Sequence, residues 1–378
     1  MTNNAPLISG LEHSGFIGQQ PVLTVKHVSV DFIGKDHAPW RAVDQVSFNL
    51  HAGEVMGLVG ESGCGKTTLM LSLMRLLSVN GRIVNGEINL MGRDLLDLSE
   101  NEMADVRWKD IAMIFQGAMN ALNPVLTVGE QIIEALLRHH AVIGMDEANR
   151  RVAELFDLVG MPPSRSNQYP FQFSGGMRQR VMIAMALACS PPVVIADEPT
   201  TALDVMIQAQ ILELLSELRK RLGMAVILVT HDLGVIAELC DSVLVMYGGV
   251  AAEYTDVDTL YNKPAHPYTQ NLLKAFPDLS HPTGKLISIP GYPPRIDALP
   301  PGCRFAPRCP QVFERCHREK PPLYQLSEHS RHIPLEHSGC TCPEPGFHQA
   351  SCFLYSAHSE PHQDAMVRSR VSEVQSEP

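Results

Sequence analysis

The sequence has no run of eighteen or more apolar residues, the length that a helix needs to cross a bilayer. Its longest apolar candidate, 181–196, is interrupted by Ser190, Pro191 and Pro192. The first twenty residues contain neither lysine nor arginine, so they lack the basic start of a secretory signal. From these absences we expect a cytoplasmic protein without membrane-spanning helices.

Positive charge is also scarce. Lysine and arginine number 30 against 41 aspartates and glutamates, which gives a formal net charge of −11. Nucleic-acid-binding proteins usually present a basic surface, so we expect no nucleic-acid partner. Hydrophobic residues make up 45% of the 378 positions, an ordinary share for a globular chain that holds one large domain with an appendage, or two domains.

Strand and helix patterns alternate from residue 21 to residue 275, which predicts an α/β domain. The strand candidates "GEVMGLVG", "PPVVIADE" and "DSVLVMYGG" are almost continuously apolar. Such strands indicate a mostly parallel sheet that is covered by helices. Residues from about 117 to 175 are expected to form a helical subdomain.

The composition changes after residue 275. Eleven prolines lie between positions 277 and 322, and they disfavour long helices and central strands. We therefore expect a small Pro/Cys-rich C-terminal extension over 276–356. The segments 357–378 and 1–20 lack a core-forming pattern, so we expect a disordered tail and a mobile N-terminus.

One segment fits the phosphate-binding pattern G-x-x-x-x-G-K-[ST] between an apolar strand and a helix. Its glycines allow backbone N–H groups to surround phosphate oxygens. Lys66 can reach the β- and γ-phosphates, and the Thr67 hydroxyl can bind Mg²⁺. A chance match is the alternative, but the strand–loop–helix context argues against it. The predicted nucleotide-binding positions are Gly60, Glu61, Ser62, Gly63, Cys64, Gly65, Lys66, Thr67 and Thr68.

Three further strand ends carry candidate catalytic groups. Asp197 ends "VVIAD" and can hold Mg²⁺, while Glu198 is expected to point the other way on an extended chain and to polarise the attacking water. His231 follows "AVILVT" and is either a γ-phosphate contact or a solvated histidine. Gln116 ends "IAMIFQ" and is either a contact to Mg²⁺ or the attacking water, or an ordinary loop glutamine.

The stretch "FSGGMRQR" places Ser174, Gly175 and Gly176 at the start of a predicted helix. A helix start offers free N–H groups and the positive end of a dipole, which suits an anion. The plain alternative is a serine N-cap followed by flexible glycines, although a helix start does not require two of them.

Taken together, these motifs resemble the ATP-binding subunits of ABC transporters. The resemblance covers residues 22–275 and rests on "GESGCGKT", "FQ" at Gln116, "FSGGMRQR", "VVIADE", "ALD" at Asp204 and "TH" at His231. It implies an α/β P-loop ATPase core with an antiparallel β subdomain and a helical subdomain. It also implies ATP hydrolysis, with ATP and Mg²⁺ as ligands.

In that family two subunits pack head to tail. The resemblance implies that Ser174, Gly175 and Gly176 grip the γ-phosphate of ATP on the opposite subunit, and that Asp204 lies across the interface. It also implies adenine stacking on Phe32, with Trp40 as the second choice. The segment departs from the common form, which begins with leucine and has glutamine where Met177 stands.

Two segments, "QGAMNALNPVLTVGEQI" and "NKPAHPYTQNLL", resemble the peptide and nickel importers, with peptide favoured. That branch implies a second, homologous ATPase subunit, two transmembrane permease subunits and an external substrate-binding protein. Residues 116–131 would receive a short helix of the permease, at the cytoplasmic face of the inner membrane. A soluble ATPase acting on nucleic acid is disfavoured by the single P-loop, the acidic charge and the lack of heptads. A P-loop kinase is disfavoured as well, because it would leave the "FSGG" segment without a function.

Six of the nine cysteines fall between positions 303 and 352. Cys303, Cys309 and Cys316 are spaced more widely than in a zinc knuckle, and the importer branch carries a similar element with a later cysteine, here Cys352. Three interpretations remain: a four-iron, four-sulfur (4Fe-4S) cluster, a zinc site, and buried thiols. Cys340 and Cys342 are alternatives for the fourth ligand.

Overall fold

The computed structural model describes most of the chain. The expected mobile N-terminus, except Gln20, and the expected tail lie outside it. None of the helices described in it is long and apolar enough to cross a membrane. The described ranges are 20–34, 38–117, 121–275, 289–327, 330–334 and 347–356.

The larger of two sheets has nine strands in the order β12-β11-β13-β10-β9-β3-β8-β7-β6. Its five strands from β9 to β6 are parallel, and the others pair antiparallel. The parallel strands are buried along their whole length, which explains their continuous apolar sequences. The strands are β3 (Val55–Val59), β6 (Ile111–Ile114), β7 (Val193–Asp197), β8 (Ala225–Val229), β9 (Ser242–Tyr247), β10 (Val250–Asp256), β11 (Tyr324–Ser327), β12 (Ser330–Pro334) and β13 (His348–Ala350).

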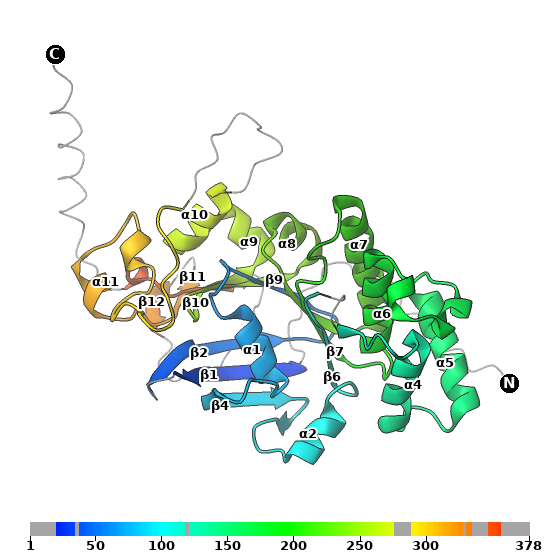
Figure 1. Ribbon diagram of the computed structural model, residues 1–378. Helices are drawn as coiled ribbons and strands as arrows, with labels where there is room; N and C mark the ends of the chain where they lie inside the picture. The colour runs from blue at the N-terminus through cyan, green and yellow to red at the C-terminus, as the bar shows by residue number, and fades with distance from the viewer. Residues whose placement is uncertain are drawn as a thin grey trace.

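The smaller sheet is antiparallel, with the order β2-β1-β4-β5. It faces α1 (Lys66–Leu73) and the larger sheet across a hydrophobic cluster that includes Leu23, Phe48, Leu58 and Leu69. Figure 1 shows these strands in blue beside α1. The strands are β1 (Leu23–Ile33), β2 (Pro39–Leu50), β4 (Gly81–Leu90) and β5 (Arg93–Asp94).

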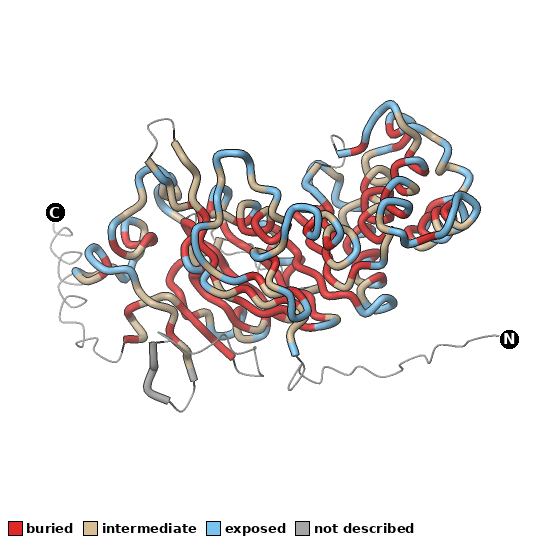
Figure 2. The backbone as a smooth tube through the Cα atoms, turned by 90° about the horizontal axis from the view of Figure 1, so that it is seen from below, coloured by how far each residue is buried: buried red, intermediate tan, exposed pale blue. Residues whose placement is uncertain are grey.

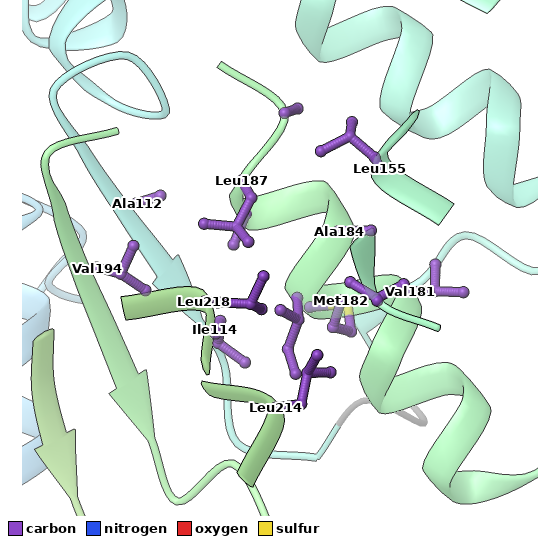
Figure 3. Close-up of a cluster of buried hydrophobic side chains, with 14 of the residues drawn as sticks. Ala112, Ile114, Leu155, Val181, Met182, Ala184, Leu187, Val194, Leu214 and Leu218 are labelled. Atoms are coloured by element: carbon purple, nitrogen blue, oxygen red, sulfur yellow. The ribbon is translucent and has the colours of Figure 1, made fainter. Parts of the chain in front are cut away.

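A second hydrophobic cluster joins the β6 and β7 side of the sheet to a group of helices, as Figure 3 shows. It includes Ile114, Val194, Leu155, Met182 and Leu218. Burying each such side chain contributes about 1.5–3 kcal/mol. The helices are α2 (Glu100–Val106), α4 (Val128–Arg138), α5 (Met145–Leu158), α6 (Gly175–Ala186), α7 (Val205–Leu222), α8 (Leu233–Leu239), α9 (Val257–Asn262), α10 (Pro267–Ala275) and α11 (Glu314–Arg318), with 3₁₀ turns at Pro163–Asn167, Pro170–Gln172, Ala306–Arg308 and Phe353–Tyr355.

Capping residues determine where the helices begin and end. Thr127 caps α4 and forms a reciprocal capping box with Glu130, and Gly223 ends α7 with a left-handed φ of 66°. Figure 2 shows the burial concentrated in the strands, with exposed segments at the rim.

The α/β class predicted from the sequence is confirmed, and the strands from β9 to β6 are parallel as expected, but the larger sheet as a whole is mixed because its strands from β10 to β12 pair antiparallel. The sheet also continues past residue 275, because β13 pairs with β10 through Glu253 and Ala350. The described residues between 289 and 322 form only short helical turns, as their prolines predict.

Candidate functional site

The segment 60–68 forms the turn between β3 and α1, and its backbone fits only glycine at two positions. Gly60 has φ 151° and Gly65 has φ 103°. A Cβ at Gly60 would overlap the backbone oxygen of Met246, and one at Gly65 would lie 2.8 Å from the oxygen of Ala42. A loop with this close backbone approach can present N–H groups to an anion.

Lys66 begins α1 and is buried. Its Nζ donates to the oxygens of Gly60 at 2.6 Å and Glu61 at 3.2 Å, so the ammonium lies over the loop. Cys64 is only 1% exposed and belongs to the hydrophobic cluster, and burial raises the pKa of its thiol. Its side chain therefore packs in the core, beneath the loop, where the sulfur accepts a weak hydrogen bond from Lys66 Nζ at 3.8 Å.

Asp197, at the end of β7, is 2% exposed, and its Oδ1 has no hydrogen-bond partner among the described residues. Burial, followed by the charge of Glu198, raises the pKa of this carboxyl, while a hydrogen bond from Thr67 and the charge of Lys66 oppose the shift. A buried carboxylate oxygen left unpaired beside a threonine hydroxyl fits a hard cation such as Mg²⁺. The residues present therefore fit the predicted metal ion.

Gln116, Glu198 and His231 come together although they are far apart in the sequence. Gln116 Nε2 donates to Glu198 Oε2 at 2.6 Å, and Thr201 Oγ1 donates to the same oxygen at 2.9 Å. His231 Nδ1 lies 3.8 Å from Glu198 Oε1, and its side chain is 72% exposed. One carboxylate is thus held in place between an amide and an imidazole.

The expected extended backbone at Glu198 is wrong, because this residue has φ 46°. A left-handed conformation at a residue other than glycine is sparsely populated. This backbone conformation turns the chain after the buried Asp197, and the Glu198 side chain then lies towards Gln116 and His231.

Ser174 caps α6, and its Oγ accepts from the N–H of Met177 at 3.4 Å. A Cβ at Gly176 would lie 2.5 Å from Cγ2 of Ile207 on α7, whereas a Cβ at Gly175 would meet Leu203 at 3.3 Å. The close packing of α6 against α7 therefore requires glycine at position 176, which the sequence did not reveal. Figure 1 shows α6 beside α7 and well apart from α1.

The remaining predicted residues occupy other parts of the surface. Asp204 caps α7, where its Oδ1 accepts from the N–H of Ile207 at 3.0 Å. Phe32 and Trp40 are paired across β1 and β2 and are both half-buried. Met177 accepts a weak hydrogen bond from Arg165 at 3.8 Å and packs against the core.

The prediction of an iron–sulfur cluster or zinc ion at the C-terminal cysteines is wrong. In the described ranges no group of three or more His, Cys, Asp or Glu side chains is placed to hold a metal ion. Burial raises the pKa of Cys309 and of Cys352 to about 12, so both side chains are neutral thiols. Cys303 and Cys309 pack beside Phe305, and Cys316 is buried beside Phe353. Cys340 and Cys342 lie outside the described residues.

One neighbour of the loop was not found by sequence reasoning. Arg308, in the C-terminal extension, forms two hydrogen bonds to the carboxylate of Glu61. The two residues are 247 positions apart, and neither has a local pattern that would indicate the contact.

Comparison with known proteins gives two family matches. Residues 43–201 match the ABC transporter family, and residues 252–316 match the C-terminal region of oligopeptide/dipeptide transporters.

Among curated relatives, the chain is 48% identical to the oligopeptide transport ATP-binding protein AppD of Bacillus subtilis, over 80% of this chain and 92% of AppD. It is 45% identical to the dipeptide transport ATP-binding protein DppD of Escherichia coli, over 84% of this chain and 98% of DppD. Neither name mentions an iron–sulfur cluster.

A solved structure, the dimeric post-hydrolysis state of the ATP-binding cassette MJ0796 bound to ADP and Pi, matches with a TM-score of 0.56 and 29% identity. The match covers 62% of this chain and 98% of the MJ0796 chain. The fold, the P-loop geometry and these matches agree. The chain therefore belongs to the ABC transporter family, among the ATP-binding subunits of peptide importers of the oligopeptide/dipeptide type.

Proposed function

We propose that this chain is the ATP-hydrolysing motor of an importer that takes up peptides. The observation that carries the proposal is the cluster of Gln116, Glu198 and His231 at the strand ends beside the P-loop. The names of the relatives support the solute class, since AppD is an oligopeptide and DppD a dipeptide transport protein.

In this proposal Glu198 is the general base of ATP hydrolysis. It accepts a proton from the attacking water, and Gln116 and Thr201 fix its Oε2 by hydrogen bonds. His231, beside Oε1, contacts the γ-phosphate side of the site. Lys66 supplies positive charge to the β- and γ-phosphates.

Asp197 and Thr67 would hold Mg²⁺, and Gln116 would contact the ion or the attacking water. When bound, Mg²⁺ supplies neutralising charge to the phosphates. The unpaired Oδ1 of Asp197 supports this assignment.

Ser174, Gly175 and Gly176 serve the nucleotide of a second subunit. Figure 1 draws α6, which begins at Gly175, apart from α1, and this separation supports the arrangement. Asp204 and the exposed Val205 and Met206 would face the partner across the dimer interface. Phe32 takes the adenine, with Trp40 as the alternative.

An ABC importer ATPase works as a dimer with membrane permease subunits. We propose in addition that the second ATPase subunit is homologous but not identical, that an external binding protein delivers the peptide, and that the assembly sits at the cytoplasmic face of the inner membrane. The exposed Val125, in the stretch 116–131, belongs to the surface that would receive the permease helix.

We propose the same domain boundaries as the sequence predicts. Residues 21–275 form the nucleotide-binding domain with a helical subdomain at 117–175, and 276–356 form the extension. Limited proteolysis followed by mass spectrometry tests these boundaries: segments 1–20 and 357–378 are expected to be removed first, and cleavage near 275 is expected next.

The test of function is ATP-dependent uptake into proteoliposomes that contain both ATPase subunits and both permease subunits, with the binding protein outside. Labelled dipeptide is expected to accumulate, and Lys66→Ala is expected to abolish ATP binding and uptake. Accumulation of Ni²⁺ in place of peptide would make the chain a nickel importer subunit. Hydrolysis without uptake of any solute would contradict transport and favour a non-transport ATPase.

A further inference from the structure

The C-terminal extension reaches back to the P-loop through one arginine. Arg308 Nη1 donates to Glu61 Oε2 at 2.6 Å, and Nη2 donates to Oε1 at 2.9 Å, so the pair is bidentate. The Arg308 side chain is 5% exposed and that of Glu61 is 24% exposed. A bidentate, largely desolvated pair is much stronger and more directional than an exposed ion pair.

Aromatic residues fix both partners of this pair. Arg308 Nη1 also donates to the hydroxyl of Tyr247 at 3.2 Å, and the N–H of Glu61 donates to the hydroxyl of Tyr268 at 2.9 Å. The rings of Tyr247, Tyr268 and Phe305 lie with centroids 4.6–5.4 Å apart. Glu61 is therefore held at its main chain and at its side chain.

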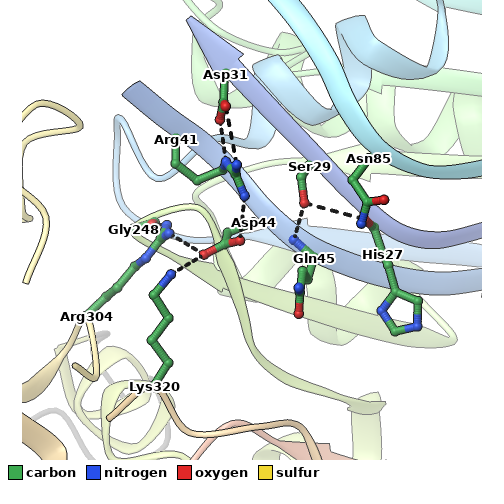
Figure 4. A network of polar contacts seen from close by, with 10 residues as sticks. All are labelled: His27, Ser29, Asp31, Arg41, Asp44, Gln45, Asn85, Gly248, Arg304 and Lys320. Carbon is green, nitrogen blue, oxygen red and sulfur yellow. Dashed lines mark hydrogen bonds and ion pairs between the residues drawn. The ribbon is translucent and has the colours of Figure 1, made fainter. Parts of the chain in front are cut away.

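The extension has a second anchor behind the loop, drawn in Figure 4. Arg304 donates to Asp44 Oδ2 at 2.7 Å and to the oxygen of Gly248. Lys320 donates to the same Asp44 oxygen at 2.8 Å. The next residue, Gly249, donates its N–H to the oxygen of Cys64 inside the P-loop at 2.9 Å. Two separate contacts thus connect the extension to residues 60–68.

The charge of Glu61 is the reason to expect a functional role for this contact. A carboxylate at the second position of a phosphate-binding loop repels a triphosphate unless a cation compensates it. Arg308 supplies that cation and holds the carboxylate against the extension.

We propose that Arg308 is a positioning residue for ATP binding: it neutralises Glu61 and holds the entrance of the P-loop in the form that accepts the triphosphate. The proposal rests on the assignment of residues 60–68 to the phosphate site. It gives the extension a role in the affinity of the site for nucleotide, although Arg308 does not itself touch the nucleotide.

The test measures ATP affinity and steady-state kinetics of the full-length chain in the assembled transporter. Arg308→Ala is expected to weaken ATP binding by about tenfold, a typical size for coupling between two sites. KM should rise in step, while kcat at saturating ATP should stay within about twofold, because the lost interaction does not concern the reacting atoms. Arg295→Ala is the matched control, since Arg295 belongs to the same extension but pairs with Asp297 at the surface.

The deciding variant combines Arg308→Ala with Glu61→Gln. If charge compensation is the role, removing the carboxylate should restore most of the lost affinity. A double variant as weak as Arg308→Ala alone would overturn the proposal, because loss of packing in the extension cannot be repaired at Glu61. Normal affinity of Arg308→Ala would overturn it as well.

Lys66→Ala separates this outcome from failure of the site assignment. If Lys66→Ala binds ATP normally, residues 60–68 are not the phosphate site and both proposals fail. If Lys66→Ala loses ATP while Arg308→Ala binds normally, only the role of Arg308 fails.

Discussion

Replacing Glu198 by glutamine is the sharpest test of the catalytic assignment, because the structure predicts that little else changes. Gln116 and Thr201 both donate to Glu198 Oε2, and the amide oxygen of a glutamine can accept both hydrogen bonds. The amide nitrogen then takes the place of Oε1 near His231. The variant keeps its shape and loses its proton acceptor.

The expected loss follows from the size of general-base catalysis. Such a base contributes about 10²–10⁴-fold to a rate, which corresponds to about 3–5 kcal/mol in the barrier. ATP binding should persist or tighten, because the variant removes one negative charge from the site. The ATP-bound closed dimer should therefore accumulate.

The assay is single-turnover release of phosphate by the assembled ATPase pair, with ATP binding and dimer formation measured separately. Thr201→Val is the matched control: it removes one hydrogen bond to Glu198 and leaves the carboxylate, so its rate should fall far less. Hydrolysis by Glu198→Gln within about threefold of the parent rate would refute the assignment of Glu198 as the base.

Two further predictions concern stability. Gly176→Ala should lower the free energy of unfolding by about 1–3 kcal/mol, because its Cβ would lie 2.5 Å from Ile207. Gly175→Ala should cost less, and adding Ile207→Ala to Gly176→Ala should remove the steric overlap. Thermal unfolding of the parent protein, the two single variants and the double variant checks this. Burial lowers the pKa of His266 from 6.5 to about 4, so the unfolded chain binds a proton between these values that the folded chain does not. The free energy of unfolding should therefore fall by about 2 kcal/mol from pH 8 to pH 5. Denaturant titrations should show this fall, and His266→Asn should abolish it.

The parts of the site that the sequence predicted are those set by short-range geometry. A P-loop needs glycines, lysine and threonine at fixed spacing between a strand and a helix, and Gly60, Gly65 and Lys66 occupy that arrangement. Asp197 could be placed because a strand in a parallel sheet directs its carboxyl end to the ligand edge.

The parts that the sequence did not predict depend on the path of the whole chain. The left-handed backbone at Glu198 and the packing of Gly176 against Ile207 are set by contacts with other elements. The cysteine spacing indicated a metal site, yet among the described residues these thiols pack in hydrophobic clusters with Phe305 and Phe353, and no group of side chains is placed to hold a metal ion. Spacing along the sequence does not show whether side chains converge in the folded chain.

The residues of the loop 60–68 are of two kinds. The N–H of Glu61 already donates to Tyr268, and the N–H of Cys64 donates to the oxygen of Glu61 at 3.2 Å. An N–H group that donates inside the protein is not available to a phosphate oxygen at the same time. The N–H groups of Glu61 and Cys64 therefore hold the loop in shape, while we propose that Lys66 supplies charge to the nucleotide. Because Arg308 and Tyr268 contact Glu61 from distant parts of the chain, a motif search finds the loop but misses the residues that keep it in place.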